Sequence, residues 1–172
     1  MKLKQITKQE FNTFFKLLTA DFCYEEHKNK EKEFEAVISN PLFNASFINI
    51  NNKDVGYICF WDFGNFIFIE HFAIFKHLRC QGLGTMFCEW FFKQYKKPII
   101  FEVEKPTNTQ TRRRINFYKK LNIVFNEFEY TQPSYHNGND SIPMFIASYK
   151  KPISLNEYNS YISTIKKYVY EL

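Results

Sequence analysis

The chain has 172 residues and a formal net charge of +5, from 23 Lys and Arg against 18 Asp and Glu. Hydrophobic residues make up 45% and charged residues 24%, which excludes collagen-like, low-complexity and largely disordered proteins. The basic excess is modest and mostly dispersed, so it favours a solubilising surface over a nucleic-acid interface. The cluster Arg112-Arg113-Arg114 leaves nucleic-acid binding as a weaker alternative.

The positions of the cysteines and of the apolar residues indicate which cofactors and which cellular compartment to expect. The four cysteines form no C-x-x-C pair, and the four histidines complete no zinc pattern, so we expect neither a disulfide framework nor a bound metal. The first five residues lack the apolar stretch of a signal peptide, and no apolar run approaches the roughly 20 residues of a membrane span. We therefore expect a cytoplasmic protein with reduced thiols and no membrane partner.

Hydrophobic spacing predicts the elements of the first half of the chain. They are a short strand over 3–6, a helix after Thr7, a helix over 25–38, and strands over 46–51, 55–62 and 66–75. Turn residues at 52–54 and 64–65 separate these three strands, which predicts an antiparallel meander.

Helices and strands alternate in the second half. The expected elements are a helix after Gly82-Leu83-Gly84, a strand over 98–103, a helix carrying Ile115, Tyr118 and Leu121, strands over 123–128 and 144–149, and a C-terminal helix over 154–170. This alternation predicts at least one parallel strand pair joined by a right-handed crossover. With no internal repeat or linker, we expect a single domain over residues 1–172. Its fold class is α/β (α+β), with a mixed, mostly antiparallel sheet flanked by helices.

The segment Arg79-Cys80-Gln81-Gly82-Leu83-Gly84-Thr85 carries the most chemical information. It joins a predicted strand to a predicted helix, and its glycines allow a tight turn that leaves backbone N–H groups uncovered. Such amides at a helix N-terminus form an anion site, to which Arg79 could add a charged fork. The segment is neither a P-loop nor a dinucleotide fingerprint, because the Lys-Ser/Thr pair and the third glycine are missing. A ligand-free turn is the structural alternative.

Three segments together resemble the GNAT superfamily of acetyl-CoA-dependent N-acetyltransferases. They are the strand Ile69–Ile74, the R-x-x-G-x-G loop that follows it, and the Phe117-Tyr118-Lys119-Lys120-Leu121 stretch of a later helix. The resemblance extends over nearly the whole chain, and several short motifs are similar to those of a bacterial branch of unassigned substrate.

This resemblance implies a cofactor, acetyl-CoA, and a place for it. The fourth and fifth strands would splay apart, and the pantetheine arm would pair with the backbone near Phe72, Ala73 and Ile74. The pyrophosphate would lie on the loop residues Arg79, Cys80, Gln81, Gly82, Leu83, Gly84 and Thr85. Thr111 occupies the position of the family's usual cofactor-binding Asn, and Asn108 could either replace it or cap the helix.

The resemblance also implies direct attack of a primary amine on the thioester in a ternary complex. Tyr118 would protonate the departing thiolate. The alternative is that Tyr118 is only an aromatic side chain packed in the core. Glu70, Glu102 and Glu104 are candidate bases, of which we rank Glu70 first. We expect Glu102, Glu104 and Tyr135 to contact the substrate. Strand alternation places Glu70 on one face with Phe72 and Ile74, unless a bulge intervenes.

Other functions and partners stay open at this point. The acceptor could be a small-molecule amine or a peptide N-terminus, and acidic residues in the cleft would favour a cationic one. A non-catalytic module that binds acyl-CoA or a protein partner is the alternative function. A homodimer could form through an exposed edge strand or through the C-terminal helix.

Overall fold

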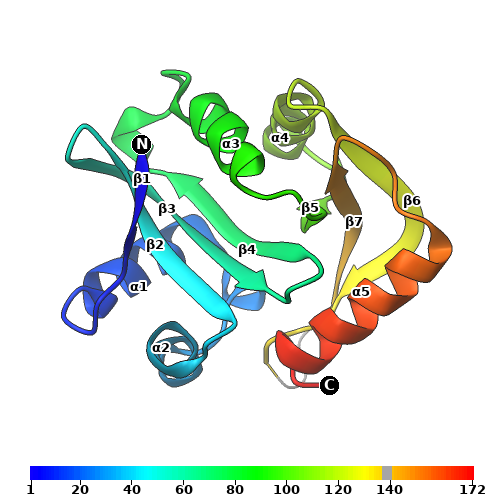
Figure 1. Cartoon of the computed structure of the whole chain (residues 1–172), viewed down its shortest axis with the longest axis horizontal. Helices are drawn as coiled ribbons and strands as arrows, with labels where there is room; N and C mark the ends of the chain where they lie inside the picture. The colour runs from blue at the N-terminus through cyan, green and yellow to red at the C-terminus, as the bar shows by residue number, and fades with distance from the viewer. Residues whose placement is uncertain (137–140) are drawn as a thin grey trace.

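The computed structural model describes residues 1–136 and 141–172 (Figure 1). Its strands are β1 (Lys2–Gln5), β2 (Phe43–Ile50), β3 (Lys53–Asp62), β4 (Ile67–Ile74), β5 (Ile99–Glu104), β6 (Ile123–Gln132) and β7 (Ile142–Tyr149). Its α-helices are α1 (Phe11–Asp21), α2 (Lys30–Ser39), α3 (Leu83–Gln94), α4 (Thr109–Lys119) and α5 (Leu155–Tyr168), with 3-10 turns η1 (Tyr24–Glu26) and η2 (Lys76–Leu78). No described helix has the length and apolar character needed to cross a membrane.

The strands form one sheet in the order β1-β2-β3-β4-β5-β7-β6. Each neighbouring pair is antiparallel except β4 and β5, which run parallel and are joined by the crossover helix α3. The mixed, mostly antiparallel sheet expected from the sequence is thus confirmed. The parallel pair arises because a strand–helix–strand unit returns its second strand in the direction of the first.

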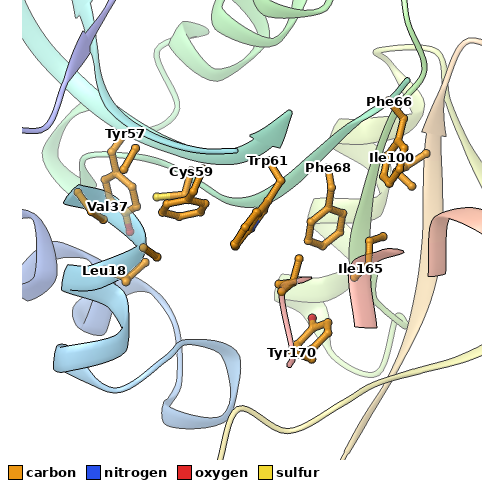
Figure 2. Close-up of a cluster of buried hydrophobic side chains, with 14 of the residues drawn as sticks. Leu18, Val37, Tyr57, Cys59, Trp61, Phe66, Phe68, Ile100, Ile165 and Tyr170 are labelled. Atoms are coloured by element: carbon orange, nitrogen blue, oxygen red, sulfur yellow. The ribbon is translucent and has the colours of Figure 1, made fainter. Parts of the chain in front are cut away.

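A hydrophobic core covers each face of the sheet. One core unites α1, α2 and α5 with side chains of β3 and β4, including Leu18, Trp61 and Ile165 (Figure 2). The other core unites α3 and α4 with the opposite face, including Phe91 and Ile115. Figure 1 shows α3 and α4 over one face, with α1 and α2 beneath the other. The helices therefore cover the sheet on both sides and leave its strand ends for the site.

The helix predicted over 25–38 is wrong at its start. The chain makes the short turn η1 and passes through an extended segment before α2 begins at Lys30. Asn29 caps α2, because its side chain accepts a hydrogen bond from the N–H of Lys32 at 2.9 Å. The break matters for the site, because it leaves Lys28 between η1 and α2 rather than on a helix surface, with its ammonium on Glu70.

The sheet divides where β4 and β5 diverge. These strands pair only through Ile67–Ile99, Phe68–Ile100 and Ile69–Phe101. The register of β3 on β4 also shifts at this point, since Cys59 lies opposite His71 whereas Phe60 lies opposite Ile69. Glu70 is the extra residue of this bulge, which bends the strand away from β5 and changes the face to which side chains point.

Candidate active site

The diverging strands open a cleft of about 560 Å³. Nearly all the site residues expected from the sequence line it: Glu70, Phe72, Ala73, Ile74, Arg79, Cys80, Gly82, Leu83, Gly84, Thr85, Glu102, Glu104, Tyr118 and Tyr135. Gln81 and Asn108 are the two that do not. The cleft runs from the N-terminus of α3, past the ends of the paired segment, to Tyr135.

The loop before α3 presents backbone donors to one end of the cleft. Among the described residues, none receives a hydrogen bond from the N–H groups of 80–85, and the first such bond runs from Met86 N–H to the Gly82 carbonyl at 3.0 Å. Gly82 has φ of +78°, a left-handed conformation that glycine adopts without strain. Free amides at the start of a helix create a positive potential that suits a phosphate group.

Arg79 is held in place at the edge of this loop. Its Nε donates to the carbonyl of Ile74 at 2.8 Å, and its terminal nitrogen lies 2.6 Å from Asp21 Oδ1. Its side chain keeps 43% of its surface exposed, whereas Asp21 is 7% exposed. The guanidinium is thus anchored by α1 and β4 while a face of it stays open to an anion.

The two residues outside the cleft make local contacts instead. Asn108 caps α4, accepting the N–H of Thr111 at 2.9 Å, while the Thr111 hydroxyl accepts the N–H of Asn108 at 3.0 Å. The Gln81 side chain donates to the carbonyl of His77 at 3.4 Å. The cap role that the sequence allowed for Asn108 is therefore the one this geometry displays.

The bulge separates Glu70 from its neighbours on β4. Phe72 packs against Phe87 of α3, with ring centroids 5.1 Å apart. Glu70 instead accepts a hydrogen bond from Trp61 on the α1 and α2 side of the sheet. His71 follows to that side, where its Nε2 is hydrogen bonded to the Glu26 carbonyl at 2.8 Å. Glu70 and Phe72 thus occupy opposite faces, contrary to simple strand alternation.

Glu70 is enclosed by partners. Its Oε1 lies 2.5 Å from Lys28 Nζ and accepts the Tyr135 hydroxyl at 2.7 Å, and its Oε2 accepts Trp61 Nε1–H at 2.5 Å. Burial alone would raise the pKa of Glu70, but the Lys28 ammonium and these hydrogen bonds hold that pKa below its usual value. Glu70 is therefore a buried, fully engaged anion.

Glu102 occupies a different environment on β5. Its Oε1 accepts the hydroxyl of Tyr130, and its Oε2 accepts the hydroxyl of Tyr170 at 2.6 Å. Burial raises the pKa of Glu102 to about 7, and the two hydroxyl donors oppose that rise. Each carboxylate oxygen retains a second lone pair, so the group can also accept from a ligand in the cleft.

The α4 side of the cleft is basic as well as aromatic. Arg114 pairs with Glu104 at 2.6 Å, and Gln110 and Arg113 line the same wall. Tyr118 packs against Phe101 with centroids 4.9 Å apart, and no described residue is hydrogen bonded to its hydroxyl. Burial raises the pKa of Tyr118, which keeps its hydroxyl protonated and able to donate.

Sequence patterns did not reveal four of the residues that build this site: Lys28, Trp61, Tyr130 and Tyr170. Each binds a cleft carboxylate from another element of the fold. The separation in sequence is 42 residues for Lys28 and Glu70, and 9 residues for Trp61 and Glu70. Periodicity reports which face of an element is buried, so it carries no signal for such contacts. No group of three or more His, Cys, Asp or Glu side chains suited to a metal ion occurs in the described part of the chain.

Comparison with known proteins adds independent information. The profile of the family described as acetyltransferase (GNAT) family matches residues 9–123. YjbC of Bacillus subtilis (strain 168), provisionally named an acetyltransferase, is 31% identical over 112 residues, which are 62% of this chain and 54% of YjbC. The chain thus spans about half the length of this curated relative.

Solved structures resemble all or most of the chain. A protein of Bacteroides thetaiotaomicron, provisionally named a GNAT acetyltransferase, has a TM-score of 0.94 and 30% identity, over 100% of this chain and 99% of that one. Spermidine N-acetyltransferase of Vibrio cholerae, in complex with CoA and spermine, has a TM-score of 0.60 and 9% identity, over 85% and 93% of the two chains. The second likeness concerns the fold alone.

Proposed function

The chain belongs to the acetyltransferase (GNAT) family, and from this premise we propose that it transfers the acetyl group of acetyl-CoA to a primary amine. The observation that carries the proposal is the cleft between β4 and β5, which begins at six free backbone amides and ends at carboxylates. That arrangement suits a long ligand with a diphosphate at one end and a reactive carbonyl further along.

Acetyl-CoA supplies the activated acetyl group, and this chain's residues would hold it. The amides of 80–85, with Arg79 beside them, suit the pyrophosphate. Within residues 1–136 and 141–172, the edge of β4 near Phe72, Ala73 and Ile74 has no pairing partner on the β5 side, so it can accept the pantetheine amides as a strand would. An uncovered N–H of the same edge could stabilise the oxyanion of the tetrahedral intermediate.

We assign the proton acceptor to Glu102 rather than to Glu70. A base works best when its pKa lies near the working pH, and that of Glu102 is about 7. Glu70 is a poor candidate, because the Lys28 ammonium and two hydrogen bonds stabilise its ionised form. Glu70 then contributes negative potential, while Glu102 takes the proton from the amine directly or through water.

Tyr118 is the proposed donor to the departing thiolate. Its raised pKa keeps the proton on the hydroxyl until the sulfur develops charge, and its hydroxyl is not engaged by a described residue. The amine would attack directly in a ternary complex, without an acetylated enzyme. The cleft's carboxylates, Glu26 and Glu104 among them, favour a cationic acceptor.

Two finer points belong to the same proposal. Cys23, Cys59, Cys80 and Cys88 are all free, which suits a reducing compartment such as the cytoplasm. A homodimer is also proposed, through the outer edge of β1 or through the exposed side of α5.

Release of free thiol from acetyl-CoA in the presence of an amine panel tests the function. Small primary amines, polyamines, amino acids and short peptides serve as acceptors. We expect acceptor-dependent thiol release that is lost in Glu102→Gln. Cofactor binding without thiol release from any acceptor would instead support a non-catalytic acyl-CoA-binding module.

A further inference from the structure

The last residues of the chain reach the proposed base. Tyr170 follows α5, and its hydroxyl donates to Glu102 Oε2 at 2.6 Å across 68 residues of sequence. Tyr170 is 8% exposed, and its neighbours Val169 and Ile165 are 1% and 0% exposed. This end of the chain is therefore held in the core. Figure 2 shows Tyr170 near Ile165, in the core beneath Trp61 and Phe68. Tyr170 is thus a buried part of the site rather than a surface cover for the sheet.

Tyr170 also lies between the two acidic groups of the cleft. Its ring is 4.8 Å from the ring of Tyr135, whose hydroxyl donates to Glu70. The other oxygen of Glu102 accepts from Tyr130 of β6. Three tyrosine hydroxyls therefore donate to the two carboxylates, one to Glu70 and two to Glu102. All three lie outside residues 9–123, the segment that the family profile matches.

We propose that Tyr170 is a positioning residue for acetyl transfer: its hydroxyl fixes the Glu102 carboxyl in the cleft, so docking of the C-terminal helix completes the site. The proposal rests on the proposed function, in which Glu102 accepts the proton. A hydrogen bond donated to a carboxylate stabilises the charged form over the neutral one, which can only accept weakly at that oxygen.

Other charged groups around Glu102 set the background for this effect. Glu70 on β4 disfavours its ionisation, and Lys28, before α2, favours it. The Tyr135 hydroxyl is committed to Glu70, and the Glu104–Arg114 ion pair lies two residues further along β5. Tyr170→Phe leaves all of these charged groups in place and removes the hydroxyl that donates to Glu102.

The test compares Tyr170→Phe with Tyr168→Phe, a control on the last turn of α5 whose side chain is 42% exposed. The readout is kcat/KM for one amine against pH at saturating acetyl-CoA. Using the same amine throughout cancels the amine's own ionisation. We expect the acidic limb of the Tyr170→Phe profile to move up by about one pH unit, which lowers kcat/KM about tenfold below the limb. The control profile should match the wild type.

A second variant and a second readout keep the outcome decisive. Tyr130→Phe should move the acidic limb in the same direction, because it removes the other donor. Carbon-13 NMR titration of the Glu102 carboxyl, assigned by its loss in Glu102→Gln, reports the same displacement without turnover. An unmoved carboxyl titration in Tyr170→Phe overturns the proposal. So does a moved titration with an unmoved kinetic limb. Absence of turnover in the wild type overturns the proposed function. The NMR titration needs no turnover, so it tests the Tyr170–Glu102 hydrogen bond separately.

Discussion

The Lys28 ammonium lies 2.5 Å from Oε1 of Glu70, and the two side chains are only 5% and 2% exposed. A buried ion pair is costly to desolvate, and it persists only where geometry and extra hydrogen bonds compensate. Here Trp61 and Tyr135 supply those bonds to Glu70. The pair joins the extended segment before α2 to the bulge of β4, and so fixes one wall of the cleft.

Lys28→Met should destabilise the fold strongly, by about 3–5 kcal/mol, because it leaves the Glu70 carboxylate buried without its counter-ion. Urea unfolding measures the effect. Lys32→Met is the matched control, since Lys32 forms an exposed pair with Glu171 and its loss should cost less than about 1 kcal/mol. The double variant Lys28→Met/Glu70→Gln should recover most of the stability. Equal losses of stability in Lys28→Met and Lys32→Met would show that the buried ion pair contributes no more than the exposed one.

Glu102→Gln should impair turnover, whereas Glu70→Gln should impair stability. Loss of a general base lowers turnover by about 100-fold or more, so Glu102→Gln should lose kcat and the acidic limb of the pH profile while still binding acetyl-CoA. Glu70→Gln should lose mainly stability, because it leaves Lys28 unpaired. Stopped assays of thiol release, with unfolding curves alongside, separate these effects. If Glu70→Gln loses the acidic limb and Glu102→Gln keeps it, the assignment is reversed.

Tyr118→Phe removes the hydroxyl proposed to protonate the thiolate and leaves the ring packed against Phe101. We expect kcat to fall by about 10- to 100-fold with little change in acetyl-CoA affinity. Tyr95→Phe, a partly buried tyrosine packed against Phe91 away from the cleft, serves as the control. Unchanged turnover in Tyr118→Phe would remove the tyrosine from the mechanism.

Glu33 gives the fold a distinct pH dependence. Its carboxyl is 0% exposed and both oxygens lack hydrogen-bond partners among the described residues. Burial raises the pKa of Glu33 above its ordinary value of 4.5, an effect that Lys28 opposes. Between pH 4.5 and the raised pKa of Glu33, the folded protein retains a proton that the unfolded chain has released. The free energy of unfolding therefore falls as pH rises through this interval.

Glu33→Gln removes this titration while keeping the shape of the protonated side chain. The variant should gain stability relative to the wild type between pH 5 and pH 8, by up to about 1.4 kcal/mol per pH unit. Chemical unfolding across that range measures the difference. Glu35→Gln on the same helix, at a more exposed position, should track the wild type. A constant difference between Glu33→Gln and the wild type at every pH would contradict a shifted pKa.

The parts of this molecule that the sequence predicted well are local in origin. The meander from β2 to β4, the loop before α3 and the alternating second half follow from periodicity and turn residues over short windows. The bulge at Glu70 was not predicted, because it depends on how β3 and β4 align. The Tyr170–Glu102 contact was missed for a related reason, since only the packing of α5 on the sheet brings the chain end to β5.

Calorimetric titration of Gly82→Ala against Gly64→Ala shows whether the free amides before α3 bind the diphosphate of acetyl-CoA. Both glycines have similar positive φ, +78° and +82°, and a Cβ at either would meet no atom of the described residues within 4 Å, so alanine should strain both turns equally. We predict one acetyl-CoA per wild-type chain with sub-millimolar Kd, about tenfold weaker binding in Gly82→Ala, and wild-type affinity in Gly64→Ala. No heat of binding at millimolar acetyl-CoA, or equal affinities in the two variants, would show that these amides do not bind the diphosphate.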